Sequence, residues 1–298
     1  MILIADSGGT KTDWTLLHAP SPYVKHDIVT TFKTQGITPI HMSVAEIRSI
    51  LEKELLHELA VFPRAALVQL GAFEHSFMEK LVVYFYGSGC TPDHAPMMVR
   101  ILSEVIGTPK VEVYSDLMAS ARALCQHEEG IACILGTGAN SCLYDGEKMV
   151  QNTPALGYIL GDEGSGSVLG RLFMNAIFKN PMFKDIRDEY LSDNKLTQAD
   201  IIEKVYRQPM ANRFLATTSL YIASHIDNPL LAQLVIANFR QFFRSNIDPY
   251  KRKDLPVHFV GSMASTYTEQ LNEAARLEGY TIGNIMQSPM EGLIKYHR

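Results

Sequence analysis

The densest chemical signal in the sequence is the run Asp6-Ser7-Gly8-Gly9-Thr10-Lys11-Thr12-Asp13. It separates two strand-like stretches, Ile2–Ala5 and Asp13–Leu17, so the glycines are predicted to form the turn of a hairpin. Small residues in succession let backbone N–H groups approach phosphate oxygens and so create an anion-binding concavity. The run therefore predicts a phosphate site, although an ordinary glycine hairpin has the same pattern.

Side chains of this first hairpin could add to phosphate binding. Thr10 and Thr12 offer hydroxyl donors, and Lys11 offers a positive charge. Asp6 ends the first strand, from which its carboxylate could reach a Mg²⁺ ion through a water molecule. The run matches neither the P-loop pattern nor the G-x-G-x-x-G pattern, so neither of those nucleotide-binding folds is indicated.

A second run of the same kind, Leu135-Gly136-Thr137-Gly138-Ala139-Asn140-Ser141, follows the apolar stretch Ile131–Leu135. An extended pattern resumes at Ser141–Tyr144, so this run is also predicted to be a hairpin turn. The two runs lie about 130 residues apart, and each ends a strand in its own half of the chain. Their shared layout favours phosphate binding by both and indicates a structural duplication rather than a sequence repeat.

A candidate catalytic base stands in Tyr114-Ser115-Asp116, where Asp116 ends the predicted strand Val111–Tyr114 and begins a helix. A carboxylate in this place is often a simple helix N-cap. Beside two phosphate loops it could instead accept the proton of an attacking hydroxyl, as phosphoryl transfer requires. Asp116 is therefore the candidate catalytic residue.

Two further runs of small residues could contact a substrate. The run from Gly157 to Gly166 holds four glycines and two acids. It is either an exposed turn or a loop whose Asp162 accepts hydrogen bonds from substrate hydroxyls. In Phe259-Val260-Gly261-Ser262-Met263-Ala264 a strand leads into small residues, and Gly261 could let a flat adenine ring approach the backbone.

The elements that must position these residues alternate between strand and helix in the first half, which favours an α/β layered fold. Ser43-Val44-Ala45-Glu46 is a capping-box pattern that predicts the start of a helix, and Leu81–Tyr86 has the pattern of a buried strand. The stretch from Leu172 to about Asn246 is predicted to be mostly helical. Other predicted elements are helices at Ala95–Ile106, Thr268–Glu278 and Met290–His297 and a last strand at Val257–Val260. No linker separates the halves, so we expect two domains that touch across a cleft.

The composition is ordinary for a globular enzyme, with 46% apolar and 20% charged residues in a chain of 298. The net charge of −5 gives no reason to expect a nucleic-acid partner. No apolar run approaches the ~20 residues that span a bilayer, and the N-terminus resembles a strand rather than a leader, so we expect a cytoplasmic protein without a membrane partner. Cys90, Cys125, Cys133 and Cys142 form no C-x-x-C pair and are expected to be reduced core thiols.

The five segments described above, in their order along the chain, resemble the N-acetylglucosamine kinase family. They are Asp6–Asp13, Tyr114–Asp116, Leu135–Ser141, Gly157–Gly166 and Phe259–Ala264. That family is close kin of the activator-ATPase family of benzoyl-CoA reductase and hydroxyglutaryl-CoA dehydratase. Both belong to the actin/hexokinase/chaperone ATPase superfamily. The resemblance covers nearly the whole chain and is closest to bacterial glucosamine or N-acetylglucosamine kinases. It is most specific in Gly136-Thr137-Gly138-Ala139-Asn140 and Gly161-Asp162-Glu163-Gly164-Ser165. It implies ATP and Mg²⁺ as cofactors and transfer of the γ-phosphate of ATP to a hydroxyl of an amino sugar.

The fold implied by the resemblance is α/β, with two ribonuclease-H-like (actin-like ATPase) domains facing each other across a cleft. Residues 1–117 would form the first domain and residues 118–288 the second. The C-terminal helix, about residues 289–298, would return to the first domain. The expected partner is a small-molecule sugar, and apolar stretches among the helices of the second half would suit a homodimer.

The resemblance also implies roles for individual residues. Asp116 would be the catalytic base and would hold a sugar hydroxyl. The ATP phosphates would be bound by Gly8, Gly9, Thr10 and Thr137, and the adenosine would lie at Gly261, Ser262 and Thr266. The sugar would be bordered by Ala139, Asn140, Leu156, Gly157 and Asp162.

At two positions the chain departs from the animal members of that family. They carry Trp before the glycine that matches Gly157, where this chain has Leu156, so one sugar-facing ring is missing. They place Asn in the loop after the second strand, where this chain reads Gln35-Gly36-Ile37-Thr38. Thr38 is the nearest polar substitute, with a shorter reach. The ATP half of the site is therefore better matched than the sugar half.

Two other functions stay open at this point. An ATP-driven activator of a radical acyl-CoA dehydratase or reductase would hold an iron–sulfur cluster at a dimer interface through cysteines, an arrangement that the four cysteines do not show clearly. A sugar sensor without catalysis would bind ATP without turning it over.

Overall fold

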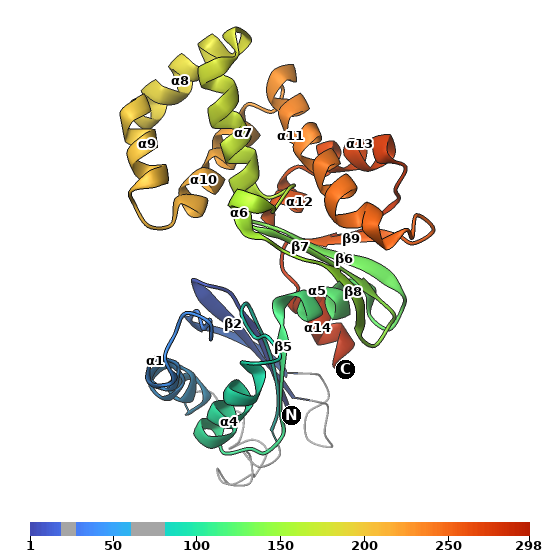
Figure 1. Cartoon of the computed structure of the whole chain (residues 1–298). Helices are drawn as coiled ribbons and strands as arrows, with labels where there is room; N and C mark the ends of the chain where they lie inside the picture. Colours follow the sequence, from blue (N-terminus) through green and yellow to red (C-terminus); the bar gives the residue numbers. More distant parts are fainter. Residues whose placement is uncertain (19–27, 61–80) are drawn as a thin grey trace. The chain divides into compact units, whose positions relative to one another are not determined.

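The computed structural model describes residues 1–18, 28–60 and 81–298 (Figure 1). The chain divides into two compact units. Unit 1 comprises Met1–Ala123 and Pro289–Arg298, and unit 2 comprises Leu124–Ser288. Each unit is built on one mixed five-stranded sheet with helices packed against it. The predicted α/β fold with two domains is therefore confirmed.

The sheet of unit 1 has the strand order β3-β2-β1-β4-β5. Strands β1, β2 and β3 are antiparallel neighbours, whereas β1, β4 and β5 run parallel. In the parallel part, Ser7 lies opposite Gly87, and Gly87 lies opposite Ser115. The residues that follow these three strands therefore emerge at one edge of the sheet. The bounds are β1 Ile2–Ser7, β2 Lys11–His18, β3 Ile28–Gln35, β4 Val82–Gly87 and β5 Val111–Ser115.

The helices of unit 1 begin and end where the sequence provides caps. Helix α1 (Val44–Ile50) starts with the predicted capping box of Ser43 and Glu46 and continues into the π-helical turn η1 (Leu51–Leu55). Helix α4 (Ala95–Ile106) stops at Gly107, whose φ of 78° suits glycine. Helices α5 (Asp116–Cys125) and α14 (Met290–Tyr296) complete the set. The core between sheet and helices includes Leu3, Trp14, Ile47, Phe85 and Ile101.

The sheet of unit 2 repeats that of unit 1, with the strand order β10-β9-β6-β7-β8. Strands β6, β7 and β8 are antiparallel neighbours, and β6, β9 and β10 run parallel. Each strand thus has a counterpart in unit 1 with the same neighbours and directions, which confirms the predicted structural duplication. The bounds are β6 Gly130–Leu135, β7 Ala139–Tyr144, β8 Met149–Thr153, β9 Val257–Val260 and β10 Ile282–Met286.

Most of the remaining chain of unit 2 is helical, as predicted, although the helices begin before Leu172. The core that they form with the sheet is rich in aromatic residues, among them Phe173, Phe239, Phe242 and Phe259. The helices are α6 Gly157–Leu160, α7 Gly166–Lys179, α8 Lys184–Asn194, α9 Gln198–Tyr206, α10 Ala211–Ser224, α11 Pro229–Phe242, α12 Ser262–Thr266 and α13 Thr268–Glu278. Short turns of 3-10 or π-helix lie at η2 Pro181–Phe183, η3 Phe243–Ile247 and η4 Asp248–Tyr250.

Three strands were not predicted, namely β3, β8 and β10. All three lie at an edge of their sheet, where one side of the strand is unpaired and polar residues are tolerated. Their sequences IVTTFKTQ, MVQNT and IGNIM accordingly lack a clear apolar pattern. Because β3 was not predicted, the position of one loop must be corrected. Gln35-Gly36-Ile37-Thr38 follows β3, the third strand along the chain, and not the second.

The C-terminal helix α14 packs within unit 1. A Cβ atom on Gly292 would lie 2.4 Å from the carbonyl oxygen of Ala123 at the end of α5, so the two helices touch through backbone. His297, just beyond α14, stacks on Tyr84 and makes a 2.8 Å hydrogen bond through Nε2 with the hydroxyl of Tyr86. These contacts tie α14 to the sheet, and burial lowers the pKa of His297 to about 4.

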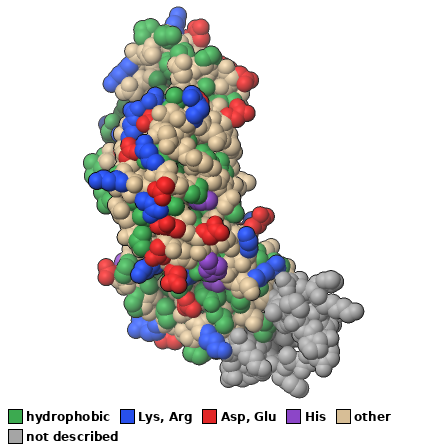
Figure 2. All heavy atoms as spheres, turned by 90° about the vertical axis from the view of Figure 1, so that its right-hand side faces the viewer, with side chains coloured by type: hydrophobic (Ala, Val, Ile, Leu, Met, Phe, Trp, Pro, Cys, Tyr) green, Lys and Arg blue, Asp and Glu red, His purple; other side chains and the backbone are tan. Residues whose placement is uncertain are grey.

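Within the described ranges, no helix combines the length and apolar character needed to cross a membrane. On the face shown in Figure 2, acidic and basic side chains are interspersed along the surface. Such a mixed distribution lacks the single-sign character of a nucleic-acid footprint on this face.

Candidate active site

The first predicted phosphate hairpin is the turn between β1 and β2. Gly8, Gly9 and Thr10 form its exposed tip, and the Gly8 N–H donates to the Lys11 carbonyl at 3.0 Å. Gly36 supports the turn from behind, because its N–H donates to the Thr10 carbonyl at 3.1 Å and a Cβ on it would lie 2.3 Å from the Gly8 carbonyl oxygen. Only glycine fits at position 36 without displacing the hairpin.

Two side chains of this hairpin are already engaged within unit 1. Thr12 is fully buried, and its hydroxyl lies 2.7 Å from that of Ser7 and 3.2 Å from the Gln35 carbonyl. The exposed Lys11 ammonium forms an ion pair with Asp13 at 2.6 Å. The hydroxyl of Thr12 therefore serves the fold, which argues against its predicted contact with phosphate, and Lys11 would have to leave Asp13 to reach one.

Asp6 and Asp116 place two carboxylates at the same edge of the unit 1 sheet, since Asp6 lies near the end of β1 and Asp116 directly follows β5. Burial, followed by the charges of Asp13 and Asp116, raises the pKa of Asp6 to about 6. Burial also raises the pKa of Asp116, although the hydrogen bond from the Leu117 N–H (2.8 Å) opposes this effect. The charged form of each carboxylate is therefore less stable here than in water, and a bound cation or a proton would relieve this destabilisation.

The loop after β3 brings Thr38 to the loop after β4. A Cβ on Gly89 would lie 3.3 Å from the Thr38 methyl group. The Thr38 hydroxyl oxygen is buried, and it has no hydrogen-bond partner among the residues that the structure describes. Because a buried hydroxyl without a partner is unfavourable, Thr38 is suited to bind a polar group of a ligand.

The second predicted phosphate hairpin is the turn between β6 and β7, and the start of α7 supports it. The Gly166 N–H donates to the Gly136 carbonyl at 2.8 Å, and the Ser167 hydroxyl donates to the Thr137 carbonyl at 2.6 Å. Ser165 caps α7 through its hydroxyl. The run Gly161–Gly166 thus fixes the second hairpin as well as starting a helix.

Asp162 lies directly beside the second hairpin. Burial is the main reason that the pKa of Asp162 is raised, and the nearby backbone N–H groups of Ala139 and Gly157 oppose this rise. A Cβ on Gly138 would lie 3.1 Å from Oδ2 of Asp162. Asp162 therefore lies near Ala139 and Gly157, which are also predicted to border the sugar. Leu156, which precedes Gly157, is 58% exposed.

Asn140 and Gly261 complete the predicted set in unit 2. The Asn140 side-chain oxygen accepts from the Ser141 N–H at 2.9 Å and from the Asn152 amide at 3.0 Å. Gly261 has a φ of 121°, and a Cβ on it would lie 2.4 Å from the carbonyl oxygen of Leu135, just before the second hairpin. Ser262 and Thr266 begin and end the short helix α12 that follows.

The structure thus brings the predicted residues together within each unit. Unit 1 gathers the first hairpin, Thr38, Asp6 and Asp116, and unit 2 gathers the second hairpin, Gly157, Asp162 and Gly261. Sequence analysis did not single out Ser88, which directly follows β4 and so stands at the same sheet edge as Asp116, since Gly87 lies opposite Ser115. A serine after a strand is too common to mark a site.

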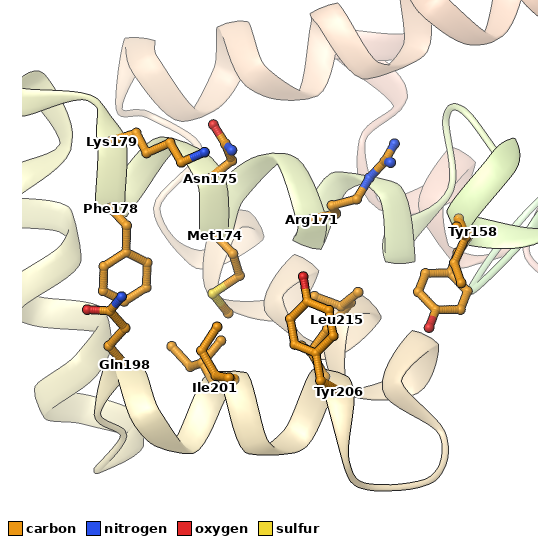
Figure 3. A pocket seen from close by; sticks show the side chains of 13 residues that line it. Tyr158, Arg171, Met174, Asn175, Phe178, Lys179, Gln198, Ile201, Tyr206 and Leu215 are labelled. Atoms are coloured by element: carbon orange, nitrogen blue, oxygen red, sulfur yellow. The ribbon is translucent and has the colours of Figure 1, made fainter.

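A pocket of about 630 Å³ lies among α6, α7, α9 and α10 of unit 2 (Figure 3). Met174 and Phe178 reach from α7 toward α9, whereas Arg171, Asn175 and Lys179 project from the other side of α7 (Figure 3). Its lining includes Tyr158 and Ile159, which directly follow the predicted sugar residue Gly157 in α6. None of the residues that line the pocket belongs to the second hairpin.

For a metal ion, the part of the chain that the structure describes contains no cluster of three or more His, Cys, Asp or Glu side chains. Asp6 fits Mg²⁺ on the chemistry of its donor. It is a carboxylate at the first predicted phosphate hairpin, and its pKa is raised by burial and then by the charges of Asp13 and Asp116. Mg²⁺ in phosphoryl-transfer sites is commonly held by one or two carboxylates together with substrate phosphates and water.

Comparison with known proteins gives a clear relative among solved structures. A "putative N-acetylglucosamine kinase" from Porphyromonas gingivalis is 46% identical, with 100% of this chain and 98% of that chain covered and a TM-score of 0.85. One of the same description from Chromobacterium violaceum is 17% identical over 100% and 98% of the chains, with a TM-score of 0.66, and shares the fold. A ROK hexokinase from Thermus thermophilus is 16% identical over 99% and 96%, with a TM-score of 0.50. No family model matches the chain, and no curated protein does.

Proposed function

Since the chain belongs to the N-acetylglucosamine kinase family, we propose that it is an ATP-dependent sugar kinase. It transfers the γ-phosphate of ATP to a hydroxyl of an amino sugar such as N-acetylglucosamine or glucosamine. The observation that carries the proposal is the half-buried carboxylate of Asp116, at the same sheet edge as Asp6 and the first glycine hairpin. A base, a metal-binding acid and a phosphate loop are the parts that phosphoryl transfer requires.

In the proposed reaction the oxygen of the acceptor hydroxyl attacks the γ-phosphorus of ATP. The bond between that phosphorus and the β–γ bridging oxygen breaks, and Asp116 takes the proton of the acceptor, so that a sugar phosphate and ADP leave. Burial raises the pKa of Asp116, which makes it a stronger base. Mg²⁺, when bound through Asp6, would neutralise charge on the phosphate oxygens.

The remaining predicted residues divide between the two substrates. The exposed tips of the two hairpins, with Thr10 and Thr137, bind phosphate groups of ATP through backbone N–H groups and hydroxyls. Gly261, Ser262 and Thr266 bind the adenosine.

Asp162 binds sugar hydroxyls, and so does Thr38, whose hydroxyl has no hydrogen-bond partner in the described part of the chain. The Asp162 carboxylate lies beside the second hairpin, because a Cβ on Gly138 would be 3.1 Å from its Oδ2. A charged acceptor at this place favours one arrangement of donors on the sugar over others.

The activator alternative finds no support in the cysteines. All four are buried, with exposed fractions between 0% and 5%. Burial raises the pKa of Cys90, Cys125 and Cys142 to about 12 and that of Cys133 as well. A cluster shared between subunits needs thiolates at the protein surface, so these cysteines suit a core role.

A coupled ADP-release assay tests the proposal. Purified protein with Mg-ATP is offered a panel of amino sugars, hexoses and muramic acids. The proposal expects release that depends strongly on one amino sugar. Release that no sugar stimulates would overturn it and would favour a sensor, or an activator if the protein also contained iron.

A further inference from the structure

Asn238 is a polar side chain in the middle of an apolar helix face. It lies in α11, which runs beside α7 (Figure 1), and it is only 1% exposed. The other buried residues of α11 are apolar, namely Leu231, Val235, Phe239 and Phe242. A buried amide is unfavourable unless both its donor and its acceptor are satisfied. The partners of Asn238 must therefore account for its presence in this core.

Both groups of the Asn238 amide bind the backbone of one loop. Its Oδ1 accepts from the Gly164 N–H at 3.0 Å, and its Nδ2 donates to the Ser165 carbonyl at 3.2 Å. The loop rests directly on α11, because a Cβ on Gly164 would lie 2.8 Å from the Cβ of Phe242. Only a side chain with a donor and an acceptor side by side satisfies both backbone groups at once. Asn238 therefore fixes two successive residues of the loop.

The loop in turn holds Asp162 and the second hairpin. The Ser165 N–H donates to the Asp162 carbonyl at 3.0 Å. Asp162 has a φ of 55°, a left-handed conformation that persists in a non-glycine residue only where the surrounding structure holds it. On the other side, the Ser165 hydroxyl lies 3.1 Å from that of Ser167, which donates to the Thr137 carbonyl at 2.6 Å. Contacts thus connect Asn238 to a proposed sugar residue and to a proposed phosphate residue.

A second asparagine holds the same loop by a separate bond. Asn246 in η3 is also buried, and its side-chain amide donates to Oε2 of Glu163 at 3.2 Å. Its backbone carbonyl accepts from the hydroxyls of Ser141 and Thr153, at 3.3 Å and 2.9 Å. The segment that carries both asparagines is thus bonded to β7 and β8 as well as to the loop.

We infer that Asn238 is a positioning residue for the proposed phosphoryl transfer, whose side-chain amide fixes the Gly164–Ser165 backbone and thereby orients both Asp162 and the second hairpin. The inference rests on the proposed function, because it assigns Asn238 a role through residues proposed to bind sugar and ATP. Asn238 itself is not proposed to contact either substrate.

Asn238→Leu removes both hydrogen-bonding groups with little change in volume. The KM values for ATP and for the sugar should each rise about 10-fold, because one substitution displaces residues that bind both. The kcat should stay within about threefold of the wild type, because Asp116 belongs to unit 1. Steady-state kinetics measures these constants, and unchanged KM values for both substrates would overturn the inference.

Asn238→Asp tests the donor separately. A protonated carboxyl has one donor and one acceptor, as the amide has, whereas an ionised one has no donor for the Ser165 carbonyl. The KM values relative to those of the wild type should therefore be raised at about pH 8 and return toward one at about pH 5.5, since burial raises the pKa of such an aspartate. Ratios that are equally high at both pH values would contradict the inference.

Val235→Ala is the matched control, since it truncates a fully buried side chain on the same helix. It should lower the midpoint of thermal unfolding, because it leaves a cavity, and leave both KM values unchanged. If it raised both KM values as Asn238→Leu does, general destabilisation would be the cause and the inference would fail.

Hydrogen exchange of single amides, measured by NMR without ligands, does not depend on turnover. In Asn238→Leu the amides of Gly164 and Gly166 should exchange about 10-fold faster or more, since the first loses its acceptor and the second donates to the Gly136 carbonyl from the same loop. Asn238→Asp at about pH 8 serves for the same measurement if Asn238→Leu does not fold. Unchanged exchange would contradict the inference even if no sugar proved to be a substrate. Failure of the proposed function would instead appear as wild-type protein without sugar-dependent turnover.

Discussion

Asp6, near the end of β1, and Asp116, directly after β5, lie at the same edge of the unit 1 sheet. The charge of Asp116 contributes to the raised pKa of Asp6, after burial and the charge of Asp13. Neighbouring carboxylates of this kind destabilise the protein unless a cation or a proton is bound. Natural sequences keep such arrangements mainly where function requires them. The pair therefore yields predictions for both stability and catalysis.

Asp6→Asn should stabilise the protein without ligands at about pH 8 while lowering its activity. The pKa of Asp6 is about 6 in the folded protein, above the usual 3.8. As pH rises between these values, the unfolded chain loses the proton and the folded protein keeps it, so the free energy of unfolding falls. Above about pH 6 the ionised Asp6 lowers the free energy of unfolding by its full amount, up to about 3 kcal/mol.

Thermal unfolding with a chelator present measures this effect. The midpoint should rise in Asp6→Asn at about pH 8 and change little at about pH 4. Asp93→Asn, at an exposed aspartate of the same unit, serves as the control and should change neither. An equal shift at both pH values would show that the ionisation of Asp6 is not responsible.

Asp116→Asn should reduce kcat by about 10²–10⁴-fold, the usual contribution of a general base. The amide keeps the shape of the side chain, so the KM for ATP should stay within about twofold. Steady-state kinetics with the preferred sugar measures both constants. A variant with nearly full turnover would remove Asp116 from the mechanism.

Gly36→Ala should weaken ATP binding although residue 36 is not proposed to touch ATP. The new Cβ would lie 2.3 Å from the Gly8 carbonyl oxygen and 2.8 Å from the Lys11 nitrogen, so the first hairpin must move. We expect the KM for ATP to rise about 10-fold or more, because backbone N–H groups bind phosphate only in a fixed arrangement.

Gly107→Ala is the comparison for Gly36→Ala. Position 107 has a φ of 78° and nothing near a new Cβ, so alanine there costs stability through backbone strain alone. Its kinetic constants should match those of the wild type. If both variants raised the KM for ATP equally, general destabilisation rather than displacement of the hairpin would be the cause.

Asp162→Asn should affect the sugar and spare the nucleotide. The asparagine lacks the charge of Asp162, and it replaces one acceptor oxygen with an NH₂ donor. We expect the KM for the sugar to rise about 10-fold or more, with the KM for ATP unchanged.

The control for this variant is Asp145→Asn, at an exposed turn where the aspartate accepts from the Glu147 and Lys148 N–H groups. It should leave both KM values as in the wild type. A rise in the KM for ATP alone in Asp162→Asn would place Asp162 on the nucleotide side instead.

The parts of the fold that could be predicted are those with a strong local signal. The strands β1 and β6 are apolar and end in glycine-rich turns, and α1 begins with a capping box. The edge strands β3, β8 and β10 carry mixed sequences, and their existence depends on pairing with neighbours. The strand order, and hence the closeness of Asp6 to Asp116, also depends on pairing between segments about 110 residues apart.

For the site, sequence indicated the residues whose own types are chemical, such as Asp116 and Asp162. It misjudged Thr12, because a hydroxyl in a glycine hairpin can turn outward to a ligand or inward to the core, and only the contact with Ser7 decides between them. It did not single out Ser88 because a serine after a strand is common. Only the parallel pairing of β4 with β5 brings this residue to the same sheet edge as Asp116, which is 28 residues away in the sequence.

Mass spectrometry of the sugar recovered after incubation with the protein and Mg-ATP tests the central claim most directly. The account predicts that an amino sugar gains one phosphoryl group with wild-type protein, and that Asp116→Asn protein at equal concentration forms far less of this product. Recovery of every amino sugar unmodified, from wild-type protein that binds ATP, would contradict it.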